Sequence, residues 1–143
     1  MTVAIASDHG GWQLKAELID YYKKQGFDFK DLGCYSEDSC DYPDIAKKMS
    51  NAILSQEVTT GILICGTGVG ISIAANRHKG IRAAILYTDD VARLAREHNN
   101  ANIAVFGGRT MRLEDVIKRI DIFLHTDFAG DRHLRRINKL DEE

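Results

Sequence analysis

Residues 61–72 read GILICGTGVGIS, an apolar run that passes directly into a glycine-rich stretch. A short apolar run is typical of a buried strand, and the glycines that follow it favour a tight turn. The segment therefore predicts a strand that ends at Cys65, then a turn, then a helix. Because this strand is apolar on both faces, we expect other elements to cover both faces of its sheet.

Short apolar runs of the same kind alternate with amphipathic stretches along the whole chain. The other expected strands cover residues 3–6, 27–32, 82–86 and 102–106. Between the strands apolar residues return at helical spacing, and a last helix is expected over about 131–140 with Asp131 as its N-cap. This alternation predicts an α/β fold, a Rossmann-like sandwich in which a five-stranded parallel sheet carries helices on both faces.

The length and charge of the chain exclude several classes of protein. Its 143 residues suit one domain, residues 1–143 with a short acidic tail, and a net charge of −2 provides no field for nucleic acid. No apolar run reaches the ~18 residues of a membrane span, and the N-terminus lacks the pattern of a signal peptide. We therefore expect a cytoplasmic protein that binds neither nucleic acid nor membrane.

The cysteines and histidines show no pattern typical of a metal site. The three cysteines, Cys34, Cys40 and Cys65, form no Cys-x-x-Cys pair, and the five histidines show no metal-ligand spacing. An odd number of cysteines in a cytoplasmic protein indicates neither a disulfide framework nor a zinc site. We therefore expect no disulfide and no bound metal.

The turn after Cys65 has the composition of an anion-binding loop. Its three glycines allow a close backbone approach, and their N–H groups combine with a helix N-terminus to attract negative charge. The same field favours the thiolate form of a cysteine. The loop lacks the sixth-position glycine of a dinucleotide fingerprint, where Ile71 stands, and the Gly-Lys-Ser/Thr end of a P-loop. Taken alone, it also fits a plain strand–helix turn around a buried cysteine.

Reactive side chains follow several of the expected strands, where open α/β sheets bind their ligands. Asp8 and His9 come after the first strand, and Arg109 comes after the last. His9 on its own also fits an ordinary surface residue. His98 continues the apolar stripe of its helix and lies at the helix end, so it is either a catalytic group or a histidine stabilised by the helix dipole.

The last helix carries a pair of arginines. Arg132 and Arg136 lie four residues apart and so share one face of the helix. Two guanidinium groups on one face suit a phosphate clamp, although the same spacing fits a solvated basic face. Leu134 and Ile137 are expected to point toward a core, and His133 is expected to have no role.

Taken together, these residues resemble the type B ribose-5-phosphate isomerase family, which includes subunits of galactose-6-phosphate isomerase. The resemblance covers nearly the whole chain. The stretches that carry it are Ser7–Gly11, Asp41-Tyr42-Pro43, Cys65–Gly70, Ala74–Arg77, Glu97-His98-Asn99, Gly107-Gly108-Arg109 and Arg132-His133. It implies an aldose–ketose isomerase of the pentose phosphate pathway that interconverts ribose-5-phosphate and ribulose-5-phosphate through an enediolate, with no metal or organic cofactor.

The resemblance also implies roles for particular residues. Cys65 looks like the base that moves a proton between the first two sugar carbons, because Ile71 stands where the glutamate subtype of the family has its base. Thr67 resembles the hydroxyl that orients the substrate. The amides expected to stabilise the enediolate belong to Gly66, Gly68 and Gly70. His98 resembles the acid–base that opens the furanose ring, assisted by Asp8 and Asn99. The expected phosphate-binding positions are His9, Arg109, Arg132 and Arg136, and Tyr42 is a candidate substrate neighbour.

The resemblance further implies a homodimer, or a tetramer of such dimers, with a site shared between chains. His98, Asn99 and Arg109 of one chain are expected to reach the partner's Cys65, His9, Arg132 and Arg136. Two alternatives stay open. One is an isomerase of a six-carbon aldose phosphate, allose-6-phosphate or galactose-6-phosphate. The other is a non-catalytic module that binds a phosphometabolite, which would not need Cys65 and His98 together.

Overall fold

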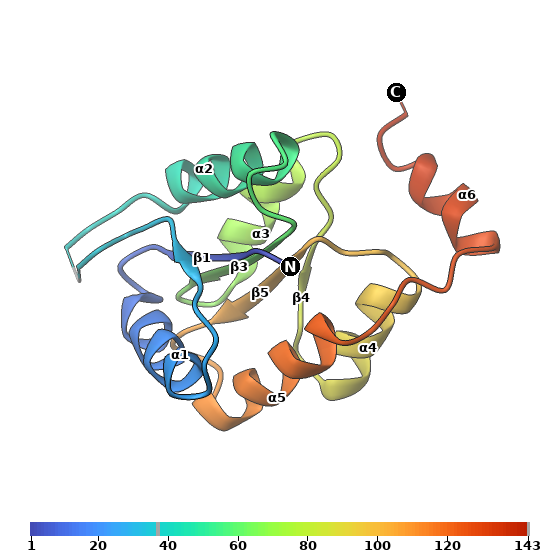
Figure 1. Cartoon of the computed structure of the whole chain (residues 1–143). Coiled ribbons are helices and arrows are strands. Elements are labelled where there is room, and N and C mark those ends of the chain that lie inside the picture. The colour runs from blue at the N-terminus through green and yellow to red at the C-terminus, as the bar shows by residue number, and fades with distance from the viewer. Residues whose placement is uncertain (37, 143) are drawn as a thin grey trace.

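The computed structural model describes residues 1–36 and 38–142 and contains a five-stranded, all-parallel sheet, as the sequence predicts (Figure 1). The strands are β1 (Val3–Ser7), β2 (Lys30–Asp31), β3 (Thr60–Cys65), β4 (Ala83–Ile85) and β5 (Ile103–Gly107). They lie in the order β2-β1-β3-β5-β4. The three central strands are apolar on both faces and are almost completely buried, which accounts for their continuous apolar runs.

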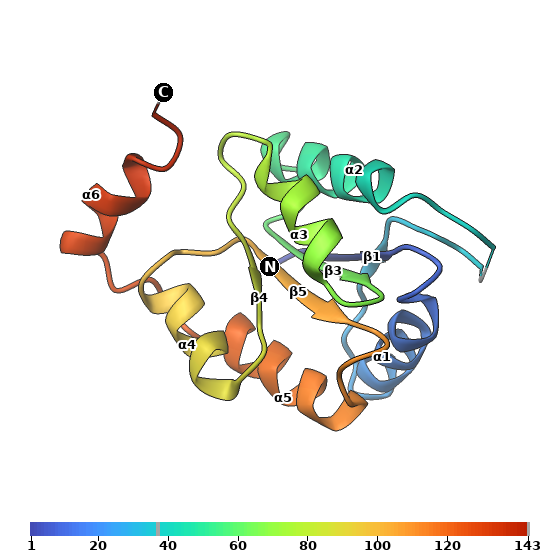
Figure 2. The ribbon, with the colours of Figure 1, turned by 180° about the vertical axis from the view of Figure 1, so that it is seen from behind.

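Helices cover both faces of the sheet, and the two views in Figures 1 and 2 show this layering. They are α1 (Trp12–Lys24), α2 (Tyr42–Leu54), α3 (Val69–Asn76), α4 (Asp89–Glu97), α5 (Leu113–Leu124) and α6 (Arg132–Asn138). One core joins α1, α4 and α5 to the sheet and includes Leu18, Ile62, Phe106, Ile120 and Phe123. The second joins α2 and α3 to the opposite face and includes Ala46, Met49, Leu63, Ile71 and Val105.

The edge elements are shorter than the sequence predicts. The strand expected over 27–32 is reduced to β2, because Phe27 and Phe29 pack edge-to-face against Tyr22, with ring centroids 6.1 and 5.0 Å away. The strand expected over 82–86 is reduced to β4. The last helix is also shorter than 131–140, and the Asp131 side chain accepts no capping hydrogen bond, so Asp131 precedes α6 without capping it through its side chain.

The strand order places a topological switch point between β1 and β3. From β1 the chain passes to β2 on one side, and it then returns to form β3 on the other side. Crossovers therefore leave in opposite directions from the carboxyl ends of two adjacent strands, where open α/β sheets bind ligands. Asp8 follows β1 and Cys65 ends β3, so both lie at this point.

The structure joins Cys34 to Cys40 in a disulfide and leaves Cys65 as a buried free thiol. The expectation of no disulfide is therefore wrong. The cysteine count of the chain carries no information about distance, whereas the fold brings the two Cα atoms to 6.5 Å, within disulfide reach. Of the helices in the described residues, none has both the length and the apolar composition needed to cross a membrane.

Candidate active site

Three loops at the carboxyl edge of the sheet are bound to one another through their backbones. The N–H of Asp8 donates to the Ile64 carbonyl at 3.2 Å, the N–H of Gly108 to the Cys65 carbonyl at 2.8 Å, and the N–H of Arg109 to the Gly66 carbonyl at 2.9 Å. A Cβ on Gly108 would lie 2.6 Å from the Gly10 carbonyl oxygen, so only glycine allows the loops to pack this closely. The edge is therefore a backbone framework that fixes the side chains after β1, β3 and β5.

Cys65 lies at the centre of this framework, with only 5% of its surface exposed. Its Sγ accepts a hydrogen bond from the N–H of Gly68 at 3.2 Å. Gly68 adopts a φ of 85°, a left-handed conformation that glycine reaches without strain. The N–H groups at the start of α3 lack intrahelical partners and carry the positive end of the helix dipole. The thiol thus lies in a field that favours negative charge.

Two other segments place side chains beside the glycine loop, which also carries Thr67. The buried carboxylate of Asp8 accepts the N–H groups of Gly10 and Gly11 at 2.9 and 3.2 Å, which fixes it at the start of α1. The Tyr42 ring covers Gly70, where an added Cβ would lie 2.8 Å from the ring carbon Cζ. Thr67 is exposed beside Cys65, and its Oγ1 accepts the N–H of Val69 at 3.2 Å.

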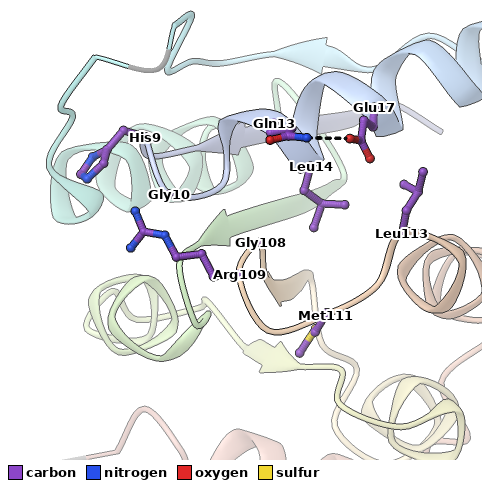
Figure 3. Close-up of a pocket in the computed structure, with 9 residues that line it drawn as sticks. All are labelled: His9, Gly10, Gln13, Leu14, Glu17, Gly108, Arg109, Met111 and Leu113. Atoms are coloured by element: carbon purple, nitrogen blue, oxygen red, sulfur yellow. Dashed lines mark hydrogen bonds between the residues drawn. The ribbon is translucent and has the colours of Figure 1, made fainter.

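His9 and Arg109 converge on a groove of about 450 Å³ between α1 and the chain that follows β5. Figure 3 shows the His9 and Arg109 side chains at one end of this groove, with Leu113 and the hydrogen-bonded pair of Gln13 and Glu17 at the other. The His9 Nδ1 lies 3.2 Å from both the backbone oxygen and the backbone nitrogen of Cys40. A guanidinium beside an imidazole at a strand-end groove suits an anionic group such as a phosphate.

His98 lies near the amino ends of the strands, at the amino edge of the sheet, opposite the carboxyl edge that carries Cys65. It follows the last residue of α4, and the chain then enters β5 at Ile103, which pairs with Gly61 near the start of β3. Cys65, four residues further along β3, pairs instead with Gly107 at the end of β5. Strands rise about 3.3 Å per residue, so the two edges stand roughly 13 Å apart. A single chain therefore does not bring Cys65 and His98 into one site.

The turn that contains His98 and Asn99 is held by two arginines. The guanidinium of Arg82 donates to the carbonyls of Asn99 and Asn100 at 2.9 to 3.1 Å. Arg96 donates from Nη1 to the Asn100 side chain at 2.9 Å and from Nε to the Thr126 carbonyl at 3.1 Å. Burial lowers the pKa of both guanidinium groups, against an opposing effect of Asp141 on Arg82 and of Asp127 on Arg96.

The C-terminal helix α6 stands beyond the end of α4, on the opposite side of the molecule from α1 (Figure 1). Its inner face consists of His133 and Ile137, which are 7% and 8% exposed, whereas Leu134 is 51% exposed. The expectation that Leu134 points toward a core is therefore wrong. The His133 ring stacks on the His98 ring with 4.2 Å between centroids. The expectation that His133 has no role is therefore also wrong.

The structure groups the candidate residues differently from the expectation for a shared site. Arg109 belongs with Cys65, because a Cβ on Gly66 would lie 3.2 Å from the Arg109 Nη1. Arg132 and Arg136 belong with His98, because they lie on the helix that carries His133. We name the two halves by their members. The thiol half contains Asp8, His9, Tyr42, Cys65, Gly66, Thr67, Gly68, Gly70 and Arg109. The histidine half contains His98, Asn99, Arg132 and Arg136.

Sequence reasoning missed Arg82, Arg96 and His133. The signal for His133 was its spacing of four residues from Ile137, which puts both on one helix face. Arg82 and Arg96 act on a turn that only the fold brings to them, so no local pattern marks them. Among residues 1–36 and 38–142, no cluster of three or more His, Cys, Asp or Glu side chains could hold a metal ion.

The fold and the thiol half define a class of α/β protein in which a buried free thiol and an arginine lie at the carboxyl edge of a parallel sheet. Comparison with known proteins narrows the class: a family model described as Ribose/Galactose Isomerase matches residues 3–140. The chain therefore belongs to the ribose/galactose isomerase family.

Individual relatives align with nearly the whole length of this chain. Ribose-5-phosphate isomerase B of Escherichia coli is 40% identical over 138 residues, which cover 96% of this chain and 93% of that protein. A crystal structure of a ribose 5-phosphate isomerase from Thermotoga maritima has a TM-score of 0.96 and 54% identity, covering 99% of this chain and 98% of the other. The Mycoplasma genitalium enzyme, solved with bound ribulose-5-phosphate, has a TM-score of 0.89 and 41% identity, covering 97% and 93%.

Proposed function

We propose that this protein is a ribose-5-phosphate isomerase, which interconverts ribose-5-phosphate and ribulose-5-phosphate in the cytoplasm. The observation that carries the proposal is the buried Cys65 thiol, which accepts the Gly68 N–H at the start of α3, in a loop that packs against Arg109. Membership of the ribose/galactose isomerase family supports it, as do the relatives named ribose-5-phosphate isomerase.

The proposed reaction uses each group for one step. His98 gives a proton to the ring oxygen of the furanose and removes one from the anomeric hydroxyl, which opens the sugar to its aldehyde. The Cys65 thiolate then takes the proton from C2, and an enediolate forms across C1 and C2. The N–H groups of the glycine loop stabilise the enediolate oxygen, because they are fixed before the charge develops. Transfer of the C2 hydroxyl proton to O1 and return of the abstracted proton to C1 leave the ketone at C2.

The remaining candidates bind and orient the substrate in this proposal. His9, Arg109, Arg132 and Arg136 hold the phosphate, whose remote binding energy fixes a small sugar in register. Thr67, Tyr42 and Asp8 contact the sugar from the thiol half, and Asn99 contacts it from the histidine half. No step requires a metal or an organic cofactor, so activity should survive chelation.

We propose that the two halves meet across a homodimer. The positions of Cys65 and His98 at opposite edges of one sheet support this, since a second copy can place its histidine half against the thiol half of the first. Half-exposed apolar residues on α3, Val69 and Ile73, lie directly after the glycine loop and provide a surface for the second copy to cover. Two such contacts, related by two-fold symmetry, give two complete sites.

The reaction is tested by incubating the purified protein with ribose-5-phosphate and measuring ribulose-5-phosphate. Allose-6-phosphate and galactose-6-phosphate serve as comparison substrates. We expect the highest kcat/KM for ribose-5-phosphate. A higher value for a six-carbon substrate would replace the proposed substrate, and turnover of none of the three would refute the isomerase.

The shared site is tested by mixing two inactive variants, Cys65→Ala and His98→Asn, by co-expression. In a mixed dimer one site receives both defects and the other receives neither. With random pairing half of the dimers are mixed, so about a quarter of normal activity should return. Absence of recovery, in a preparation shown by mass spectrometry to contain mixed dimers, would refute the shared site.

A further inference from the structure

His133 is one of only two buried residues in α6, and its surroundings are unusual for a surface helix. Arg132, Leu134 and Arg136 are all exposed, whereas His133 is 7% exposed. Its ring lies against the ring of His98 with centroids 4.2 Å apart and planes inclined by 15°. The two imidazoles therefore stack face to face, and the contact joins α6 to the end of α4.

The stack orients His98 in a way that a hydrogen bond would not. The backbone of His98 is fixed, because its N–H donates to the Leu94 carbonyl at 2.8 Å and Arg82 holds the turn that follows. Within residues 1–36 and 38–142, neither ring nitrogen of His98 makes a hydrogen bond. A contact through the ring face fixes the plane of the imidazole and leaves both nitrogens free to exchange protons.

The same contact links the ring plane of His98 to the proposed phosphate clamp. Arg132 precedes His133 directly and Arg136 follows it three residues later, so one helix carries both arginines and the stacked ring. The chain before α6 is tied to the end of α4 as well, because the Ala129 N–H donates to the Glu97 carbonyl at 3.0 Å. Any rotation of α6 would therefore move the clamp and the support of His98 together.

We infer that His133 is a positioning residue for ring opening, which holds the plane of His98 and sets its place relative to the phosphate clamp. The inference rests on the proposed function and adds to it a residue that does not touch the substrate. The property of His133 that this role requires is a flat ring, because His133 contacts His98 through its ring face. A phenyl ring should therefore replace it, whereas an aliphatic side chain should not.

The charge state of His133 is consistent with this role. Burial lowers the pKa of His133, and the nearby His98, Arg132 and Arg136 lower it further against the opposing charge of Asp131. His133 is therefore neutral at neutral pH, so the stack does not become a pair of cations when His98 takes up a proton. A neutral phenyl ring reproduces this state.

The test compares His133→Ala, His133→Phe and, as a matched control, Arg135→Ala, which alters an exposed residue of the same helix. Two activities are measured. The first is turnover of ribose-5-phosphate, which enters mainly as a closed ring. The second is the exchange of the C1 hydrogens of ribulose-5-phosphate with deuterium from solvent. That exchange requires Cys65 but no ring opening, because the ketose has too few free hydroxyls to close a furanose.

We expect His133→Ala to lower kcat with ribose-5-phosphate by about tenfold or more, as for a misplaced catalytic group. Deuterium exchange should change by less than about twofold, because proton transfer at the thiol half is intact. His133→Phe should restore most of the kcat, and Arg135→Ala should match the wild type. Thermal melting and the oligomeric state of each variant are measured in parallel.

Three results with the variants would overturn the inference. Normal turnover in His133→Ala would show that the stack is dispensable. Equal loss of turnover and exchange would indicate a structural role for His133 in folding or assembly. Failure of a folded His133→Phe variant to recover would show that the imidazole itself is required. If the wild type performs neither reaction, the proposed isomerase fails and the inference fails with it.

Discussion

The two edges of the sheet each carry half of the proposed site, but they hold it by different means. At the carboxyl edge, backbone hydrogen bonds join the loops after β1, β3 and β5, and glycines allow the close packing. At the amino edge, side chains hold the turn after α4: Arg82 and Arg96 bind its carbonyls, and His133 stacks on His98. The thiol half is therefore fixed by backbone contacts at the ends of the core strands, whereas the turn of the histidine half depends on side-chain contacts.

The difference follows from the chemistry proposed for each half. Stabilising an enediolate requires N–H donors that do not move when charge develops, and a backbone framework provides them. A group that moves protons on and off a sugar ring needs free nitrogens, so it is better oriented through its ring face. Substitutions can disrupt each edge separately. Their effects on kcat and KM should differ in size because backbone contacts hold one edge and side-chain contacts hold the other.

The largest effect is expected at Cys65. Cys65→Ala removes the proposed base, and kcat with ribose-5-phosphate should fall by about 10³-fold, within the range for a general base. Binding of ribose-5-phosphate, measured by calorimetry, should persist because the cationic groups remain. Near-normal turnover would contradict the role of the thiol.

The next effect is expected at the amino edge, in Arg82→Gln. Loss of the guanidinium frees the carbonyls of Asn99 and Asn100, so His98 should be held less firmly and kcat should fall about tenfold. Arg93→Gln is the matched control, because it removes only an exposed ion pair with Glu97 on the same helix, worth about 0.5 kcal/mol. Steady-state kinetics and thermal melts should separate the two variants, and equal behaviour would mean that Arg82 does not support the turn.

A smaller effect is expected from Gly66→Ala at the carboxyl edge. The new Cβ would approach the end of the flexible Arg109 side chain, which can move, so the fold should survive while KM rises about threefold to tenfold. Gly26→Ala is the control, since its Cβ meets nothing within 4 Å and its φ of 81° should cost only stability, about 1 kcal/mol. A raised KM in the control, or an unchanged KM in Gly66→Ala, would contradict a role for Arg109 in substrate binding.

The smallest effect is expected when Cys34→Ala and Cys40→Ala are combined. The His9 ring contacts the backbone of Cys40 and not its sulfur, so kcat should be unchanged and KM should rise by no more than about twofold. Thiol titration of the unfolded wild type should find Cys65 as the one free thiol. Three free thiols would show that the disulfide is absent under the conditions used. A large loss of kcat would indicate that Cys34 or Cys40 takes part in catalysis.

The sheet and the place of the glycine loop beside Asp8 could be predicted because their signals are local. The apolar run before Cys65 marks a strand, the glycines after it mark the loop, and the edge rule for parallel sheets brings Asp8 beside it. The histidine half depends on how α6 packs against α4, and His98 and His133 are too far apart in sequence for any periodicity to pair them. On the expected inner face of α6, Ile137 is buried but Leu134 is exposed and His133 takes its place, because spacings of three and four residues both fit a helix.

The separation of Cys65 and His98 also bears on how such a protein can evolve. Each chain carries both halves, and in the proposed dimer each complete site takes one half from each chain. If the gene is duplicated, one copy can lose its thiol half and the other its histidine half, and their heterodimer still contains one intact site. Such a pair becomes obligate as soon as each copy has lost one half. Two different subunits that each carry one half of the site would then arise through loss of residues alone, with no new catalytic group required.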